Sequence, residues 1–324
     1  MTEWLQLAAG GLLLYFGAEW FVGGASALAL SLRVPQLIVG LTVVAYGTSA
    51  PEVIVGIQAA AGGHGDVALG NVLGSNIANI GLILGVSSLV KPPRIDGSLV
   101  RREVPVLILS AAVVPLLLLD GRIAAWEAVA LLTAAAGYTG WMVRSARSGA
   151  VVDSAKKGAV LEEAAAKTAG APRAKSAAAS AVTALVGLGV LLVGGHLFVD
   201  AAVQVAQGIG VSDRVIGLTV VAVGTSLPEL VTSLIAAVRG HSDLAVGNVV
   251  GSNIFNMLLC LGAAALAGHV GAELHAVRVD LAILIGMTVL LAVFIRAERL
   301  ISRLEGGFLL ALYAAFTVWI VAFV

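Results

Sequence analysis

Two short motifs place an acid in the middle of apolar stretches. Residues 47–52 read GTSAPE and residues 224–229 read GTSLPE. An ionised carboxylate inside an apolar segment is costly unless it is paired or binds a cation. The segments that contain Glu52 and Glu229 hold no Lys or Arg to pair with them. We therefore expect each acid to bind a metal cation.

The proline of each motif is expected to break its helix. Proline lacks an N–H donor and clashes with the carbonyl four residues upstream, so Pro51 and Pro228 each disturb one helical hydrogen bond. Carbonyls freed beside the break, including those of Ala45 and Ala222, then form the negative end of a half-helix dipole. Such an end is suited to cations.

Hydroxyl groups surround each acid in the same motifs. A threonine lies four residues before each acid, and therefore on the same face of the helix, with a serine next to it. These hydroxyl-bearing residues are Thr48, Ser49, Thr225 and Ser226.

A second pair of motifs follows each acid. Residues 70–79 read GNVLGSNIAN and residues 247–256 read GNVVGSNIFN. Glycines spaced by four allow two helices to approach closely. Asn and Ser residues, also spaced by four, form one polar stripe on each helix, and they either bind an ion or join helices by hydrogen bonds. The stripes consist of Asn71, Ser75 and Asn79, and of Asn248, Ser252 and Asn256.

The ligand types indicate which cation would bind. The candidate groups are carboxylates, hydroxyls, amide oxygens and carbonyls, and neither repeated motif contains Cys or His. Calcium accepts about six to eight oxygen ligands at about 2.3–2.6 Å, whereas zinc and copper prefer nitrogen and sulfur. Magnesium holds its water too tightly for such a site. The sequence therefore favours calcium.

The motifs belong to an internal repeat. Residues 40–85 align with residues 217–262 at a constant offset of 177, with 28 identities in 46 positions and no gap. This agreement is far beyond shared hydrophobicity. The chain is therefore expected to consist of two related halves, residues 1–143 and 179–324, joined by a polar linker at 144–178.

Composition places these halves in a membrane. Apolar residues make up 59% of the 324 residues and charged ones only 12%, whereas about a quarter of the residues in a soluble domain are charged. We predict an all-α polytopic membrane protein with ten transmembrane helices, arranged as two inverted five-helix repeats. The predicted helices are 5–32, 37–61, 67–90, 104–119, 123–143, 179–206, 215–238, 244–267, 277–295 and 306–324.

Basic residues predict the orientation. If ten helices alternate, sixteen of the nineteen Lys and Arg residues fall on one side, which should be cytoplasmic. The linker would then be cytoplasmic and both termini would be outside, in the plasma membrane of a prokaryote. A formal net charge of zero argues against a nucleic-acid partner, and the single cysteine, Cys260, excludes an internal disulfide. No particular oligomeric state is predicted.

The two repeats resemble the alpha-repeats of the calcium/cation antiporter superfamily. GTSAPE, GTSLPE, GSNIAN and GSNIFN are most similar to its sodium/calcium exchanger branch. The resemblance implies exchange of calcium for sodium by alternating access, with these two ions and the lipid bilayer as partners and no cofactor. It also implies that the first and sixth helices slide across a fixed core. The implied site consists of Glu52 and Glu229, with Thr48, Ser49, Ser75, Asn79, Thr225, Ser226, Ser252 and Asn256 and the carbonyls of Ala45 and Ala222.

One position departs from some relatives. Archaeal and potassium-dependent exchangers carry aspartate where this chain has Asn256, so the resemblance argues against potassium dependence. Only two acids remain, and a site with a charge of minus two is neutral with one calcium or two sodium ions. Exchange with three sodium ions, the usual ratio in the family, would be electrogenic.

Three other functions remain open. Glu19, His196 and Asp200 also lie in apolar runs, and a proton path through them would favour calcium/proton antiport; alternatively, these side chains reach the membrane surface or form hydrogen bonds between helices. A cation channel would use the same ligands along a continuous pore. An intramembrane hydrolase would use Ser49 as a nucleophile, but Pro51 replaces the second glycine of Gly-x-Ser-x-Gly and no His-Glu-x-x-His occurs.

Overall fold

The computed structural model describes residues 2–95, 97–146, 176–210, 222–298 and 300–323. Within these ranges the regular elements are helices, and one isolated bridge joins Arg94 to Leu300. The predictions for most of the linker, and for the start of the second repeat motif at 217–221, concern residues outside these ranges.

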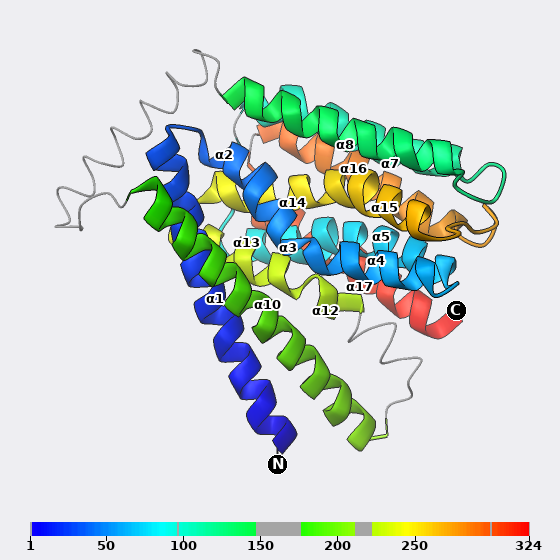
Figure 1. Ribbon diagram of the computed structural model, residues 1–324, viewed down its shortest axis with the longest axis horizontal. Helices are drawn as coiled ribbons and strands as arrows, with labels where there is room; N and C mark the ends of the chain where they lie inside the picture. The colour runs from blue at the N-terminus through cyan, green and yellow to red at the C-terminus, as the bar shows by residue number, and fades with distance from the viewer. Residues whose placement is uncertain (1, 96, 147–175, 211–221, 299, 324) are drawn as a thin grey trace.

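Two long helices cross the rest of the molecule obliquely. α1 (Thr2–Leu32) has 31 residues and α10 (Ala177–Gly208) has 32, and the two lie side by side in opposite directions (Figure 1). Both are slightly longer than the predicted helices 5–32 and 179–206. At about 1.5 Å per residue each exceeds the roughly 30 Å of bilayer hydrocarbon, which a tilted helix accommodates.

Glycines let these two helices touch along their backbones. A Cβ added to Gly17 would lie 2.4 Å from the Leu191 nitrogen, and one added to Gly187 would lie 2.3 Å from the Phe21 nitrogen. Because no real Cβ approaches backbone atoms this closely, α1 and α10 form one tightly packed pair.

The second helix of the first repeat is broken in its middle, as predicted. It comprises α2 (Gln36–Val39), a π-helical turn η1 (Gly40–Val44), α3 (Ala45–Thr48) and α4 (Ala50–Ala61). The halves 36–48 and 50–61 meet at 43° around Ser49. Pro51 lies in the first turn of α4, where its missing N–H costs no helical hydrogen bond.

The corresponding helix of the second repeat breaks at the equivalent residue. α12 (Ala222–Thr225) ends before Ser226, and α13 (Leu227–Arg239) begins after it with Pro228 in its first turn. Both proline-induced breaks are therefore confirmed in the described residues.

The next helix of each repeat forms the core. One runs through α5 (Gly65–Ala78), η2 (Asn79–Leu84) and α6 (Gly85–Val90), and the other through α14 (Ser242–Phe255), η4 (Asn256–Cys260) and α15 (Leu261–Ala267). η2 and η4 are π-helical turns that begin at Asn79 and Asn256. A π turn inserts one residue into the helix and shifts the faces that follow, and such turns are frequent at functional sites.

Four further helices flank this core: α7 (Gly97–Leu117), α8 (Ala125–Ala146), α16 (Arg278–Glu298) and α17 (Arg303–Phe323). α7 begins well before the predicted start at Val104. The prediction placed its boundary after the charged residues 101–103, but Glu103 is buried and accepts a hydrogen bond from the Tyr138 hydroxyl. Because its carboxylate has a hydrogen-bond partner, Glu103 can lie inside α7 and does not mark the start of the helix.

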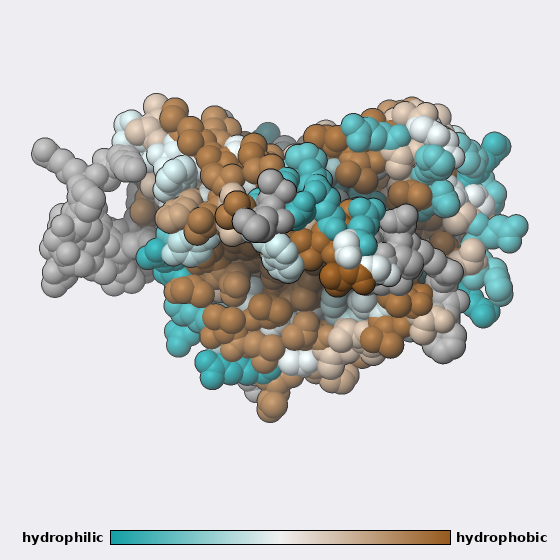
Figure 2. Space-filling view, turned by 90° about the horizontal axis from the view of Figure 1, so that it is seen from below, coloured by the Kyte–Doolittle hydropathy of each residue, from teal (hydrophilic) through white to brown (hydrophobic). Residues whose placement is uncertain are grey.

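Among the described residues, six helices have the length and composition to cross a membrane, or seven if the bent pair at 36–61 is one span. Apolar side chains cover much of the face in Figure 2, as expected for helices that contact lipid. The chain is a polytopic membrane protein, and a count of ten spans stays a prediction.

Several connecting loops in the described residues lie at the ends that the alternating topology predicts. At one end the Ile123 amide donates to the Val270 carbonyl at 2.9 Å. At the other end the Lys91 ammonium donates to the Val238 carbonyl at 3.3 Å, and Arg94 bridges Leu300. Loops that were assigned to one side of the membrane therefore lie together.

Candidate cation site

The two motif acids meet in the centre of the molecule. Glu52 lies in the first turn of α4 and Glu229 in the first turn of α13, and each is only 1% exposed. The Ser49 hydroxyl donates to Glu229 Oε1 at 3.0 Å, and the Ser226 hydroxyl donates to Glu52 Oε1 at 3.1 Å. The serine at each helix break thus binds the acid of the other repeat, which joins the repeats around one site.

Several polar atoms at this centre are buried without a partner among the described residues. They are Oε2 of Glu52 and of Glu229, and both side-chain amide atoms of Asn79 and of Asn256. Buried polar atoms are rarely left unsatisfied in folded proteins. Their oxygens are the ligand type that hard cations prefer, so this donor set fits a calcium or sodium ion as cargo.

The other predicted hydroxyls are arranged less uniformly. The Thr48 hydroxyl lies 3.1 Å from both the Val44 carbonyl and the Asn248 Oδ1 atom, and the Ser252 hydroxyl oxygen lies 2.9 Å from the Ser49 hydroxyl oxygen. The Ser75 hydroxyl donates to the Asn71 carbonyl within its own helix. Thr225, which is partly exposed, ends α12, and Ala222 begins it.

One detail of the predicted helix break is corrected. The Ala45 carbonyl is not freed, because it accepts a hydrogen bond from the Ser49 amide at 3.0 Å. The first half-helix therefore keeps its hydrogen bonding up to the break, and the carbonyl has one lone pair left for an ion. In the second repeat the Ser226 amide donates instead to Val223, at 3.1 Å.

Three residues outside the predicted ligand set direct a donor group at the backbone carbonyl of Glu52 or of Glu229. The Asn71 amide and the Cys260 thiol both donate to the Glu52 carbonyl, each at 3.1 Å. The Asn248 amide donates to the Ser233 hydroxyl at 3.0 Å and lies 3.5 Å from the Glu229 carbonyl. The polar stripes contained both asparagines, but nothing in the sequence pointed to Cys260.

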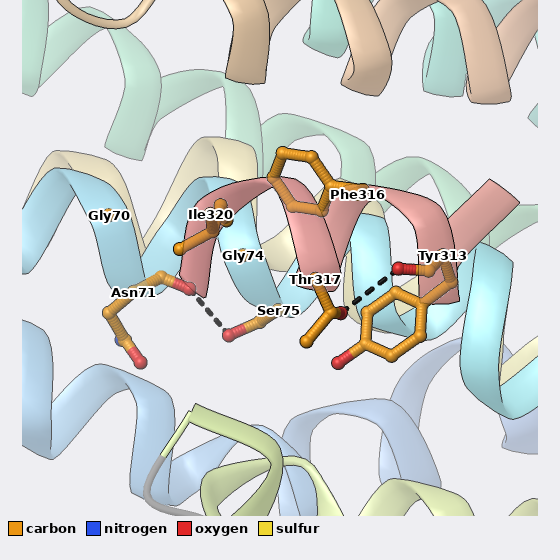
Figure 3. Close-up of a pocket in the computed structure, with 8 residues that line it drawn as sticks. All are labelled: Gly70, Asn71, Gly74, Ser75, Tyr313, Phe316, Thr317 and Ile320. Atoms are coloured by element: carbon orange, nitrogen blue, oxygen red, sulfur yellow. Dashed lines mark hydrogen bonds between the residues drawn. The ribbon is translucent and has the colours of Figure 1, made fainter. Parts of the chain in front are cut away.

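A pocket lies between α5 and α17, beside Ser75 (Figure 3). The predicted close approach at paired glycines holds for Gly247 and Gly251, whose added Cβ atoms would lie 2.9 Å and 2.8 Å from carbonyl oxygens of the second helix. No described atom comes within 4 Å of a Cβ on Gly70 or Gly74, so these two glycines line the pocket instead.

The residues of the suggested proton path separate into two pairs. Glu19 binds Arg239 through two hydrogen bonds of 2.8 Å. The His196 Nε2 atom lies 3.3 Å from Asp200 Oδ2, four residues further along the same helix. In the described part of the chain, none of these residues is hydrogen-bonded to Glu52 or Glu229.

The structure combines two related repeats, a broken helix in each, and two buried acids at the repeat interface. This combination is typical of secondary transporters for cations. The chain belongs to the sodium/calcium exchanger family, whose model, described as sodium/calcium exchanger protein, matches residues 2–144 and 179–322. This family is a branch of the calcium/cation antiporter superfamily.

Two relatives of the chain are named as an antiporter and as an exchanger. The chain is 37% identical to the putative antiporter CaxA of Alkalimonas amylolytica, with 80% of this chain and 79% of that protein covered. It is 31% identical to the sodium/calcium exchanger MaX1 of Methanosarcina acetivorans, with 78% and 79% covered. A solved structure of the sodium-calcium exchanger NCX_Mj, soaked with sodium and calcium, superposes with a TM-score of 0.83 at 33% identity, covering 100% of this chain and 99% of that one.

Proposed function

We propose that the protein is a secondary active antiporter that exchanges calcium for sodium by alternating access across ten transmembrane helices. The observation that carries the proposal is the pair of reciprocal bonds from Ser49 to Glu229 and from Ser226 to Glu52. These bonds fix one oxygen of each acid and leave the other oxygen, together with the Asn79 and Asn256 amides, for an ion. The sodium and calcium named for NCX_Mj and MaX1 support the choice of ions.

Charge determines how the two ions compete at this site. With Glu52 and Glu229 ionised the site carries minus two, so one calcium or two sodium ions neutralise it, and a third sodium adds a positive charge. Sodium and calcium can then replace each other, because both bind the same oxygen atoms. Access to a loaded and neutralised site can switch from one side of the membrane to the other at a lower cost than access to an empty site with two bare carboxylates.

We expect the linker to be cytoplasmic. A cysteine at Ser154 should react with an impermeant thiol reagent only in inside-out vesicles, because the predicted loops of that side carry most of the Lys and Arg residues. The parent protein, whose Cys260 is buried, gives the background. Labelling in intact cells would reverse the orientation of the whole chain.

Sodium coupling and charge movement can be tested in one flux experiment. Liposomes loaded with sodium should take up radioactive calcium only while sodium leaves. Three sodium ions out and one calcium in export one net positive charge, so an interior-positive potential should speed uptake and an interior-negative potential should slow it. At equilibrium each 60 mV shifts the calcium ratio about tenfold, since one charge gains about 2.3 kcal/mol per 100 mV.

Three outcomes of the same experiment would contradict the proposal. Calcium uptake that does not depend on the membrane potential would reject net charge movement during exchange. Full uptake driven by a pH gradient without sodium would assign proton coupling instead. Unitary conductance steps in a planar bilayer would identify a channel.

A further inference from the structure

An ion pair joins the oblique helix α1 to one end of α13. Glu19 Oε1 accepts from Arg239 Nε and Glu19 Oε2 from Arg239 Nη2, both at 2.8 Å. The Glu19 side chain is 21% exposed and the Arg239 side chain 54%. Two parallel hydrogen bonds between a guanidinium and a carboxylate are geometrically specific and stronger than a single contact. We call this pair the α1–α13 latch.

We propose that the α1–α13 latch biases the protein toward the state in which α1 covers the inner half of the second repeat's broken helix. The inner end is the one that we propose to be cytoplasmic. This inference rests on the proposed alternating-access function.

The two repeats are packed differently in this structure. α1 packs along α13, whereas the equivalent α10 makes at most a marginal contact with α4 in the described residues. Thr232 and Ala236 on α13 are accordingly buried, while the equivalent Val55 and Ala59 on α4 are partly exposed. The inner side of the site is therefore closed by α1, and the outer side is not closed by α10.

The repeat offset shows that the latch has no counterpart. Adding 177 to Glu19 gives His196, and subtracting 177 from Arg239 gives Gly62. In an inverted repeat, the opposite state is reached when α10 covers α4 as α1 now covers α13. His196 and Gly62 would then face each other, and glycine has no side chain with which to bind. An ion pair between helices thus stabilises only one of the two states.

The latch also acts on α10. Cβ atoms added to Gly17 and Gly24 of α1 would lie 2.4 Å from the backbone nitrogens of Leu191 and Ala184 of α10. Helices in backbone contact cannot slide past each other without separating, so α1 and α10 move together. Holding α1 against α13 therefore also holds α10 away from α4.

Two reporter cysteines measure the bias without any transport. One replaces Ala236, which α1 covers, and the other replaces its repeat equivalent, Ala59. In ion-free detergent solution we expect Glu19→Gln to raise the labelling rate at position 236 and to lower it at position 59, so that the ratio of the two rates rises about two- to fivefold. This size is typical of removing one partly exposed ion pair from a two-state equilibrium. Arg239→Gln should do the same.

His196→Gln is the matched control, because His196 is the repeat equivalent of Glu19 and lies on α10, which forms no latch. It should leave both labelling rates unchanged. Exchange of the charges, with Glu19→Arg and Arg239→Glu in one protein, should return both rates to those of the parent. The parent without a reporter gives the background from the buried Cys260.

Three results would overturn the latch. The first is an unchanged labelling rate in both Glu19→Gln and Arg239→Gln. The second is a rise of the labelling rate at both reporters, which indicates general loosening of the protein. The third is a charge-exchanged protein whose labelling rates do not return to those of the parent. Calcium flux distinguishes this failure from failure of the proposed function. If flux is sodium-driven but the reporters do not shift, only the latch is rejected; if the reporters shift but no sodium-coupled flux occurs, only the proposed function is rejected.

Discussion

Replacement of Glu52 or Glu229 by glutamine is expected to abolish calcium transport and leave a folded protein. Each carboxylate keeps one oxygen bound to a serine of the other repeat and one buried oxygen without a described partner. Glutamine preserves the shape but removes a charge from a site that must offset two positive charges. Residues around a metal ligand already change affinity about 10- to 100-fold, so loss of a ligand charge should cost at least about a hundredfold.

Radioactive calcium uptake by proteoliposomes measures this loss, and a single symmetric gel-filtration peak checks folding. Glu103→Gln is a suitable control, because Glu103 is also a buried acid but its carboxylate binds Tyr138, which is not one of the predicted ligand residues. It should retain most of the flux. Near-normal uptake by either Glu52→Gln or Glu229→Gln would reject the site, and equal loss in all three variants would point to a general effect of buried acids.

The parts of this site that follow from local chemistry could be predicted from the sequence. The cost of an unpaired acid in an apolar run pointed to Glu52 and Glu229. The steric conflict of proline pointed to helix breaks, and these lie at Ser49 and Ser226. The constant repeat offset predicted that the halves are related, and the structure brings the equivalent motifs into contact.

Contacts between distant residues could not be predicted in this way. The Ser49–Glu229 bond joins residues 180 positions apart, and nothing in either motif specifies which acid the serine binds. The partner of Glu19 lies 220 positions away, so the sequence did not identify Arg239 as that partner. The π turns at Asn79 and Asn256 were also missed, because one extra residue in a helical turn leaves no mark on the hydrophobic pattern.

Glycine substitutions should separate the packing of the α1/α10 pair from ordinary helix propensity. Gly17→Ala places a methyl group 2.4 Å from the Leu191 nitrogen, so the two backbones must move apart. Overpacking of this kind costs about 1–3 kcal/mol. We expect a lower melting temperature in detergent, together with reduced calcium flux, because α1 and α10 would no longer move as one body.

Gly23→Ala is the matched control on the same helix, since no described atom lies within 4 Å of its added Cβ. Alanine favours a helix over glycine by up to about 1 kcal/mol, so this variant should melt at the same temperature as the parent or slightly higher. The reciprocal pair on α10 repeats the comparison: Gly187→Ala meets the Phe21 nitrogen at 2.3 Å, while Gly189→Ala meets nothing in the described residues. Opposite shifts within each pair would establish backbone contact as the cause, because both members change helix propensity equally. Equal melting temperatures and equal flux within both pairs would mean that α1 and α10 tolerate separation, and the rigid-pair argument would fail.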